Sequence, residues 1–267
     1  MIETTQTWKI GDCLELLPEI ETGSIDMILT DLPYGTTACS WDIVIPFEPL
    51  WEEWKRIIKD NGAIVLTASQ PFTSMLVMSN LEMFKYCWVW YKTKGSGHVH
   101  AKNKPLKIHE DVCVFSKGTT VHAIQSSRRM NYYPQGLVKV NRINYRPSRG
   151  VTGSDVCCAA RTSHKKTLFQ EWGNYPTSVI QFANPNNNND HPTQKPVALF
   201  EYLIKTYTNE GDWVHDSCLG SGTTLEACRK TNRNCIGFEI SDEWEHLYAN
   251  RCMKHIPPLQ SYFEDVD

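Results

Sequence analysis

Short apolar runs alternate along this chain with longer stretches in which apolar residues recur every three or four positions. The short runs are rich in Ile, Val and aromatic residues, which is typical of strands buried inside a sheet. They cover residues 25–30, 62–68, 86–91, 111–116, 212–218 and 234–240. Between them, residues 197–207 predict a helix, because apolar side chains recur there at helical spacing. These side chains are Phe200, Leu203, Ile204 and Tyr207.

A second helix is predicted after Ser241, a suitable N-cap residue, because Asp242 and Glu243 fall in the first turn, where the helix dipole favours acids. Strands that alternate with helices indicate an α/β fold with a doubly wound, mostly parallel sheet. Residues 118–185 interrupt the alternation with Pro, Gly, Arg and Asn at no clear period. We therefore expect an inserted recognition region there, and a polar connector, ANPNNNNDHPTQKP, leading back into the sheet.

The composition places the chain among ordinary globular proteins. Its 267 residues, 41% of them apolar, suffice for one large domain with an inserted subdomain. No apolar run approaches membrane-spanning length, and the start MIETTQTWKI lacks a signal-peptide pattern, so we expect a cytoplasmic protein that binds no membrane. The ten cysteines never occur at CxxC spacing, which favours buried free thiols. Cys157, Cys158 and His164 make a poor tetrahedral set, so no metal site is predicted.

The net charge of −3 conceals an uneven distribution. Residues 118–185 hold nine Lys or Arg against two acids, a balance of +7 that leaves −10 for the remainder. Aromatic and amide residues lie among these charges, a mixture that favours nucleic acid, because cations bind phosphate while amides and rings contact bases. A solvated charged face is the alternative interpretation. The candidate DNA-binding residues are Arg128, Arg129, Arg142, Arg146, Arg149, Lys165 and Lys166.

The stretch DLPYGTTACSWD follows the first apolar run and has two interpretations. Asp31 and Tyr34 would present a carboxylate and a flat ring side by side at the end of a strand, which suits a flat polar group such as a nucleobase amine. Pro33 and Gly35 are also common in ordinary turns, so this stretch alone leaves both interpretations open.

A second motif, WVHDSCLGSGTTLEACRK, combines a strand, a glycine-rich loop and a helix start. Gly220 and Gly222 allow the backbone to approach a ligand, and the free N–H groups of the helix start can bind a carboxylate. Asp216 can accept from an ammonium group, and Glu239 ends the next strand, where an acid commonly binds ribose hydroxyls. Together these features predict a nucleoside with an amino-acid tail, which describes S-adenosylmethionine.

With both motifs in place, the chain resembles the amino-group DNA methyltransferases, in particular their permuted β class. The resemblance rests on DLPY at 31–34, HPTQKPVALFEYLI at 191–204, DSCLGSGTT at 216–224 and GFEI at 237–240, in that order. It implies a Rossmann-like methyltransferase sheet divided into a catalytic half (1–117), a target-recognition region (118–185) and a cofactor-binding half (186–267). Two departures are Leu32, where the family usually has proline, and DSCLGSG in place of D-P-F-x-G-S-G.

The resemblance also implies roles for individual residues. Asp31 and the Pro33 carbonyl would accept the two hydrogens of the target amine, and Tyr34 would stack on the extruded base. The S-adenosylmethionine contacts would be Asp12, Cys13, Thr193, Lys195, Asp216, Gly220, Ser221, Gly222, Thr223 and Glu239. No Pro-Cys pair is present for attack on a ring carbon, so transfer to the amine would be direct.

We expect a methyltransferase that acts on the amino nitrogen of adenine in double-stranded DNA, because cytosine-amino enzymes of this family more often carry Ser at position 31. Methylation of the cytosine N4 amine is the nearest alternative. Methylation of RNA or protein glutamine fits less well, because such enzymes usually place the cofactor loop first. A non-catalytic DNA-binding subunit would have no use for Asp31, Tyr34 and GSGT. The sequence is compatible with a homodimer and with a cognate restriction endonuclease, and it specifies neither.

The basic region generates a prediction about salt. If Arg128 and Arg129 contact DNA phosphates, changing both to Ala should flatten the slope of log K against log salt by up to about two units, because each phosphate contact contributes about 0.9. Fluorescence anisotropy across salt concentrations measures this slope. An unaltered slope would assign these arginines to a solvated face.

Overall fold

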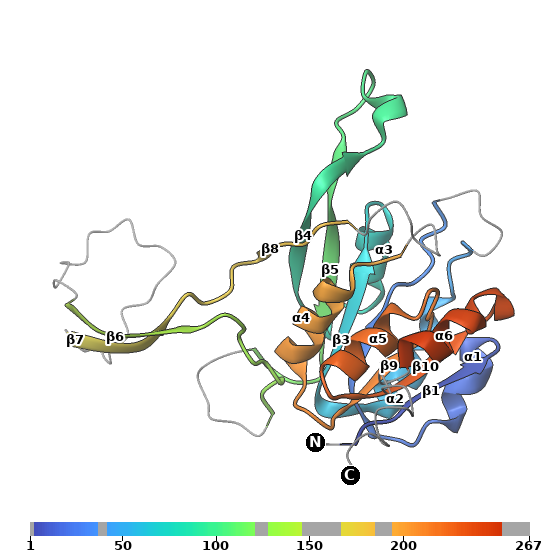
Figure 1. Ribbon diagram of the computed structural model, residues 1–267, viewed down its shortest axis with the longest axis horizontal. Coiled ribbons are helices and arrows are strands. Elements are labelled where there is room, and N and C mark those ends of the chain that lie inside the picture. Colours follow the sequence, from blue (N-terminus) through green and yellow to red (C-terminus); the bar gives the residue numbers. More distant parts are fainter. Residues whose placement is uncertain (1–2, 37–41, 121–127, 146–166, 185–193, 253–267) are drawn as a thin grey trace, which may run out of the picture. The chain divides into compact units, whose positions relative to one another are not determined.

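The computed structural model describes residues 3–36, 42–120, 128–145, 167–184 and 194–252 (Figure 1). Eight strands form one sheet in the order β1-β10-β9-β2-β3-β5-β4-β8. Their bounds are β1 Gln6–Ile10, β2 Ile25–Thr30, β3 Ile58–Ala68, β4 Phe84–Ser96, β5 Lys107–Phe115, β8 Val179–Gln181, β9 Trp213–Asp216 and β10 Asn234–Glu239. All neighbours pair in parallel except β5, which is antiparallel to both β3 and β4. The predicted α/β fold with a mostly parallel sheet is confirmed.

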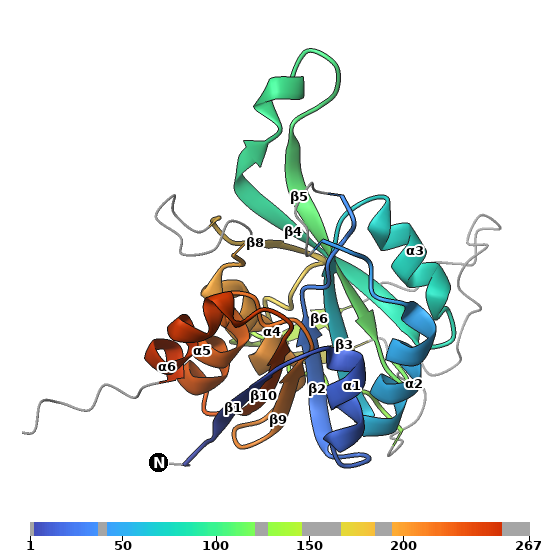
Figure 2. The same ribbon diagram turned by 90° about the vertical axis from the view of Figure 1, so that its right-hand side faces the viewer.

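Helices cover both faces of the sheet, as Figure 2 shows. One face carries α1 (Cys13–Leu16), α2 (Phe47–Ile57) and α3 (Phe72–Ser79), and the other carries α4 (Val197–Tyr207), α5 (Thr223–Lys230) and α6 (Glu245–Cys252). Short 3₁₀ turns lie at Leu17–Glu19, His98–His100 and Asp242–Trp244. The predicted helix at 197–207 is found with the same bounds. Ser241 caps the turn before α6 and accepts from the Glu243 N–H at 3.2 Å.

The strand sequences explain why helices pack on both sides. In β3, Ala63 and Val65 pack towards α4–α6, whereas Ile64 and Leu66 pack towards α1–α3, and all four are fully buried. Side chains alternate between the faces of a sheet, so a strand covered on both faces is continuously apolar. For this reason the short apolar runs predicted the central strands correctly.

Residues 134–177 form a separate compact unit, and the rest of the chain forms the main one. The described part of the smaller unit is an antiparallel pair, β6 (Val138–Tyr145) with β7 (Thr167–Gly173). Its register shifts between Lys139 and Arg142, where Asn141 has φ +45°, so no even period marks these strands in the sequence. This unit is narrower than the region predicted at 118–185, since Asn131 and Ile180 pack with the main unit. The functional division into three segments stays a prediction.

A long arm leaves the main sheet where β4 and β5 continue beyond their neighbours (Figures 1 and 2). We call residues 92–107 the β4–β5 arm. Its end is the 3₁₀ turn His98–His100, entered through Gly97 at φ +88°. The described part of the chain contains no helix that is both long enough and apolar enough to span a membrane.

Candidate active site

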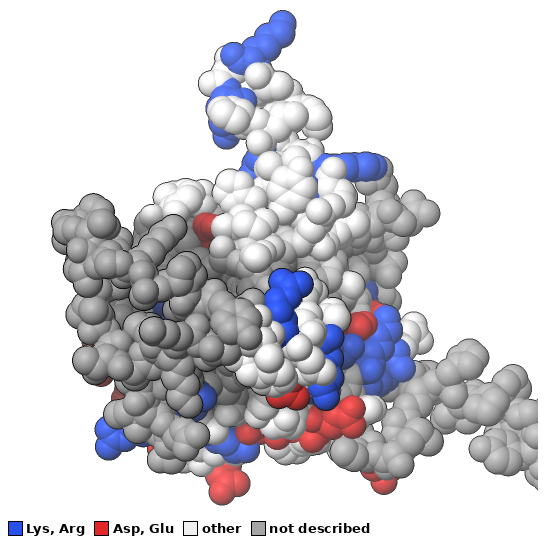
Figure 3. All heavy atoms as spheres, turned by 90° about the vertical axis from the view of Figure 1, so that its left-hand side faces the viewer, with Lys and Arg blue, Asp and Glu red and all other residues white. Residues whose placement is uncertain are grey.

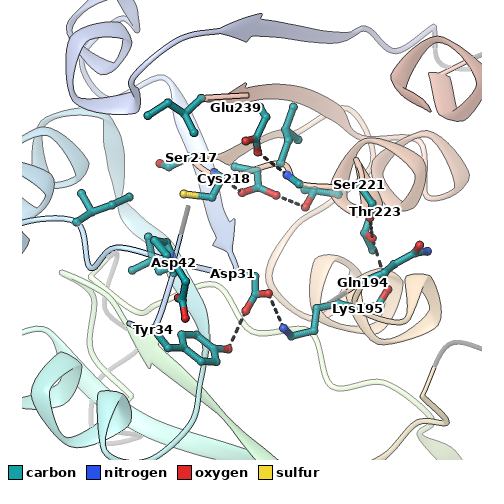
Figure 4. A pocket seen from close by; sticks show the side chains of 18 of the residues that line it. Asp31, Tyr34, Asp42, Gln194, Lys195, Ser217, Cys218, Ser221, Thr223 and Glu239 are labelled. Carbon is teal, nitrogen blue, oxygen red and sulfur yellow. Dashed lines mark hydrogen bonds and ion pairs between the residues drawn. The ribbon is translucent and has the colours of Figure 1, made fainter. Parts of the chain in front are cut away.

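The two sequence motifs meet in one cavity of about 1040 Å³ in the main unit. Parallel pairing brings the carboxyl ends of β2, β9 and β10 to the same edge of the sheet, where ligands of open α/β sheets bind. Asp31 follows β2, Asp216 ends β9 and Glu239 ends β10, and all three line the cavity. Figure 4 shows Asp31 and Glu239 there. The structure therefore brings the candidate catalytic acid and the candidate cofactor loop together.

The Asp31 carboxylate accepts hydrogen bonds from three side chains. Its Oδ1 accepts hydrogen bonds from the Tyr34 hydroxyl at 2.7 Å and from the Thr67 hydroxyl. Its Oδ2 forms an ion pair and hydrogen bond with Lys195 Nζ. The carboxylate is thus held in a fixed orientation at the cavity wall, and three of its roughly four acceptor positions are occupied by the protein's own donors.

Tyr34 and the turn around it are also held in place. The Tyr34 ring stacks on Phe72, with ring centroids 5.0 Å apart and an interplanar angle of 25°. Burial and the neighbouring carboxylates of Asp31 and Glu110 raise the pKa of Tyr34 well above its usual value, so its hydroxyl remains a proton donor. Asp42 braces the turn, because its two oxygens accept from the N–H groups of Gly35 at 2.8 Å and Thr36 at 2.9 Å.

Lys195 lies between two carboxylates. Besides Asp31, its Nζ is 3.8 Å from Glu110 Oε2, and that oxygen is buried without a hydrogen-bond partner. Burial lowers the pKa of Lys195, but the two carboxylates more than offset this, and the net pKa is raised. Lys195 is therefore a cation at neutral pH. The sequence predicted Lys195 as a cofactor contact, whereas its ammonium group faces the candidate catalytic acid.

The loop after β9 is organised by Asp216. One carboxylate oxygen accepts from the Cys218 N–H at 3.0 Å, and the other accepts from the Thr224 hydroxyl. Burial raises the pKa of Asp216 to about 7, while these hydrogen bonds act in the opposite direction. No basic side chain in the described ranges forms an ion pair with Asp216, so a cationic ligand could pair with it and favour its ionised form.

Ser217, in the same loop, belongs to a buried polar chain. Trp54 Nε1–H donates to Ser217 Oγ at 3.1 Å, and Ser217 bonds His215 Nε2 at 2.9 Å. His215 Nδ1 is 3.0 Å from the Ile236 carbonyl, which can only accept, so Nδ1 carries the proton. Burial lowers the pKa of His215 to about 4 and keeps the ring neutral.

Glu239 connects the end of β10 to the glycine-rich loop. Its oxygens accept from the Gly220 N–H at 2.7 Å and the Ser241 N–H at 3.1 Å. In the described part of the chain no basic side chain forms an ion pair with it. The Tyr248 hydroxyl donates to the Gly220 carbonyl at 2.7 Å, which fixes the loop from the other side.

Gly222 has a different environment from the other glycine-rich loop residues. It begins α5 at φ +77°, and a Cβ there would lie 2.8 Å from Tyr248 Cδ1. Gly220, Ser221 and Thr223 line the cavity, but Gly222 does not. Gly222 therefore permits α6 to pack closely against the start of α5, and its effect on a ligand would be indirect.

The remaining predicted site residues fall into three groups. Asp12, Cys13 and Pro33 line the cavity. Arg128, Arg129 and Arg142 are exposed and are not among the lining residues. Outside the described residues lie Thr193, Arg146, Arg149, Lys165, Lys166, Cys157, Cys158 and His164. Within the described ranges no group of three His, Cys, Asp or Glu side chains could hold a metal ion.

Sequence reasoning did not assign Thr67, Asp42 or Glu110. Asp42 closes the stretch DLPYGTTACSWD, and its spacing from the turn carries no recognisable signal. Glu110 lies in the segment HEDVCVFSKG, and reaches the site only because β5 pairs beside β3. Cys218, one of the cysteines expected to be buried free thiols, has its side chain at the cavity (Figure 4).

A Rossmann-like sheet with an acid at the end of each of three parallel strands is typical of enzymes that bind a nucleotide cofactor at this edge of the sheet. The sequence matches the N6_N4_Mtase family, described as DNA methylase, over residues 25–250, and the chain belongs to this family.

Individual relatives agree with this assignment. The type II methyltransferase M.HpaI of Haemophilus parainfluenzae is 28% identical over 90% of this chain and 72% of its own length. The DNA adenine methyltransferase YhdJ of Escherichia coli K12 is 27% identical over 90% of this chain and 80% of its own. The solved M1.HpyAVI–SAM complex is similar, with a TM-score of 0.59 and 21% identity over 92% of this chain and 98% of its own. The cytosine-N4-specific PvuII DNA methyltransferase has a TM-score of 0.65 and 17% identity over 95% of this chain and 89% of its own.

The surroundings of Gly222 predict a loss of stability on substitution. Gly23 also has positive φ, +64°, but a Cβ there would meet nothing within 4 Å. Gly23→Ala should therefore cost about 1 kcal/mol from backbone strain alone. Gly222→Ala should lower the free energy of unfolding by about 1–3 kcal/mol more, because Tyr248 must shift. Urea unfolding compares the two, and equal losses would contradict the assigned contact.

Proposed function

We propose that this DNA methylase transfers a methyl group from S-adenosylmethionine to the exocyclic N6 amine of adenine in double-stranded DNA. The observation that carries the proposal is the position of Asp31, whose carboxylate lies in the same cavity as the glycine-rich loop and Glu239. Relatives named as adenine methyltransferases, such as YhdJ, support the choice of adenine.

The donor set of the cavity fits S-adenosylmethionine. The cofactor carries an ammonium and a sulfonium cation, and Asp216 and Glu239 are carboxylates without a basic partner in the described ranges. Glu239 would bind the ribose hydroxyls, and the N–H groups at the start of α5 would face the cofactor carboxylate. Asp12 and Cys13 would border its adenine. When bound, the cofactor supplies an electrophilic methyl group.

The chemical problem lies in the target amine. Its lone pair is delocalised into the ring, so the nitrogen is a poor nucleophile. A carboxylate that accepts one amine hydrogen, and a backbone carbonyl such as that of Pro33 that accepts the other, draw the nitrogen towards tetrahedral geometry. The base must leave the duplex to reach Asp31, at a cost of a few kcal/mol. Positioning of the amine is then the main catalytic contribution.

Lys195 occupies the position that the amine needs. The ammonium group neutralises Asp31 and weakens it as an acceptor for the amine. Glu110 Oε2 offers Lys195 an alternative, since it is 3.8 Å away and has no hydrogen-bond partner. In the proposed mechanism Lys195 moves from Asp31 to Glu110 when the target base enters, and Asp31 Oδ2 becomes free.

This transfer of Lys195 predicts the behaviour of Glu110→Gln. The neutral amide attracts the ammonium group less, so Lys195 stays on Asp31 and kcat should fall about 10- to 100-fold, which corresponds to one charge-assisted hydrogen bond. The dissociation constant for S-adenosylmethionine should not change. In a Lys195→Met background, Glu110→Gln should lower kcat little further. If the two substitutions lowered kcat by fully additive amounts of free energy in this double-mutant cycle, the mechanism would be contradicted. The melting temperature of each variant shows whether it is folded.

Asp31→Ala tests the function itself. Removal of the carboxylate should lower methyl transfer to plasmid DNA by about 100- to 10,000-fold, because the amine loses its acceptor. Cofactor affinity, measured by calorimetric titration, should be retained, because Asp31 holds the amine and not the cofactor. Near-normal turnover in this variant would refute the role of Asp31.

The identity of the methylated base is decided by the product. Mass spectrometry of nucleosides from DNA treated with the unaltered protein should show N6-methyladenine. Cytosine N4 methylation is the second candidate, because the PvuII enzyme with a similar fold is cytosine-N4-specific. A cytoplasmic location and a homodimer remain part of the proposal. A cognate endonuclease also remains part of it, although matching relatives include both type II methyltransferases and the orphan methyltransferase M.BamHII.

A further inference from the structure

The β4–β5 arm has an unusual charge distribution. Residues 92–107 contain five lysines and two histidines and no acid. Lys94, Lys102 and Lys104 are exposed, and in Figure 3 the projecting arm carries blue but no red atoms. The sequence interpretation had assigned DNA binding to residues 118–185 and had not considered this segment.

The lysines of the outer arm are not neutralised by the fold itself. Among the described residues no carboxylate forms an ion pair with Lys94, Lys102 or Lys104. Several lysines elsewhere on the surface are paired, such as Lys9 with Glu19 and, at 2.7 Å, Lys230 with Glu226. Like charges concentrated on a narrow two-stranded projection repel one another and create a positive potential, which favours an anionic partner.

The arm begins at the mouth of the active-site cavity. Lys92 and Ser96 on β4 and Lys107 on β5 line the cavity, and the chain between them extends away from it. An extruded base would enter this cavity while the phosphates on both sides of it remain part of the backbone outside. The duplex on one side of the target must therefore lie close to the arm.

We propose that the β4–β5 arm binds the phosphate backbone of the duplex next to the extruded nucleotide; this inference rests on the proposed function. Val99 at the tip is seven positions beyond Lys92, so the arm reaches at most about 23 Å at about 3.3 Å per residue. One strand of DNA carries a phosphate every 3.4 Å, so this reach corresponds to at most about seven base pairs. Lysine binds phosphate as a point charge, and the contact adds affinity without reading sequence.

The first test is the salt dependence of DNA binding. Changing Lys94, Lys102 and Lys104 together to Ala should lower the slope of log K against log salt by up to about 2.7 units, at about 0.9 per phosphate contact. The control changes the exposed lysines of α2, α4 and α5, Lys55, Lys205 and Lys230, to Ala and alters the net charge equally. A slope that changes as much in the control as in the arm variant would overturn the proposal, as would an unchanged slope in the arm variant.

The second test locates the contact. Duplexes of equal length can carry the target base about three base pairs from one end and about ten base pairs from the other. The long flank then lies on either side of the target. The arm variant should bind more weakly than the unaltered protein only when the long flank lies on one particular side. An equal loss on every duplex would show a general charge effect and overturn the assigned position.

Two readouts separate this proposal from the proposed function. At saturating DNA and low salt the arm variant should form methylated product at the rate of the unaltered protein, and its cofactor affinity should be unchanged. If the unaltered protein forms no methylated base, the proposed function fails. If product forms normally but the arm variant shows the same salt slope and flank dependence as the unaltered protein, only the inference about the arm fails.

Discussion

The parallel pairing of β10, β9, β2 and β3 is the constraint on which the site depends. Parallel strands end at the same edge, so residues far apart in the sequence, such as Asp31 and Glu239, share one cavity. Parallel strands also require crossover connections, and the helices that form them cover both faces and make the strands apolar throughout. The same arrangement thus creates the core, the sequence pattern and the position of the acids.

Charge is organised differently in the two parts of the cavity. Near Asp31 and Glu110 the protein supplies its own cations, and Lys195 and Lys92 pair with these acids. Near Asp216 and Glu239, backbone N–H groups and hydroxyls are the donors, and the negative charge is left without an ion pair in the described ranges. The first part suits a neutral amine that must displace a cation, and the second suits a cationic ligand.

The sequence predicted those features of the fold and site that are local in the chain. Apolar runs predicted the buried strands, and the spacing of apolar side chains predicted the helix at 197–207. The motifs DLPY and DSCLGSG lie where strands end. The contacts of Lys195 were not predictable, because Asp31 is 164 positions away and Glu110 reaches the site through strand pairing. The pair β6–β7 was missed because a shift at Asn141 breaks its alternation. Exposed strands of a two-stranded unit also lack the continuous apolar pattern of the main sheet.

The departure of DSCLGSG from the family's usual loop has an evolutionary consequence. At position 217 the serine hydroxyl satisfies both the indole of Trp54 and the ring of His215, and its N–H donates to Thr30 Oγ1 at 3.1 Å. Proline, the residue usual in the family, has neither group. We therefore expect positions 217, 54 and 215 to be epistatic: a proline at position 217 alone would leave the buried indole N–H of Trp54 and the ring of His215 without this partner. A proline there would need matching changes at Trp54 in α2 and His215 in β9.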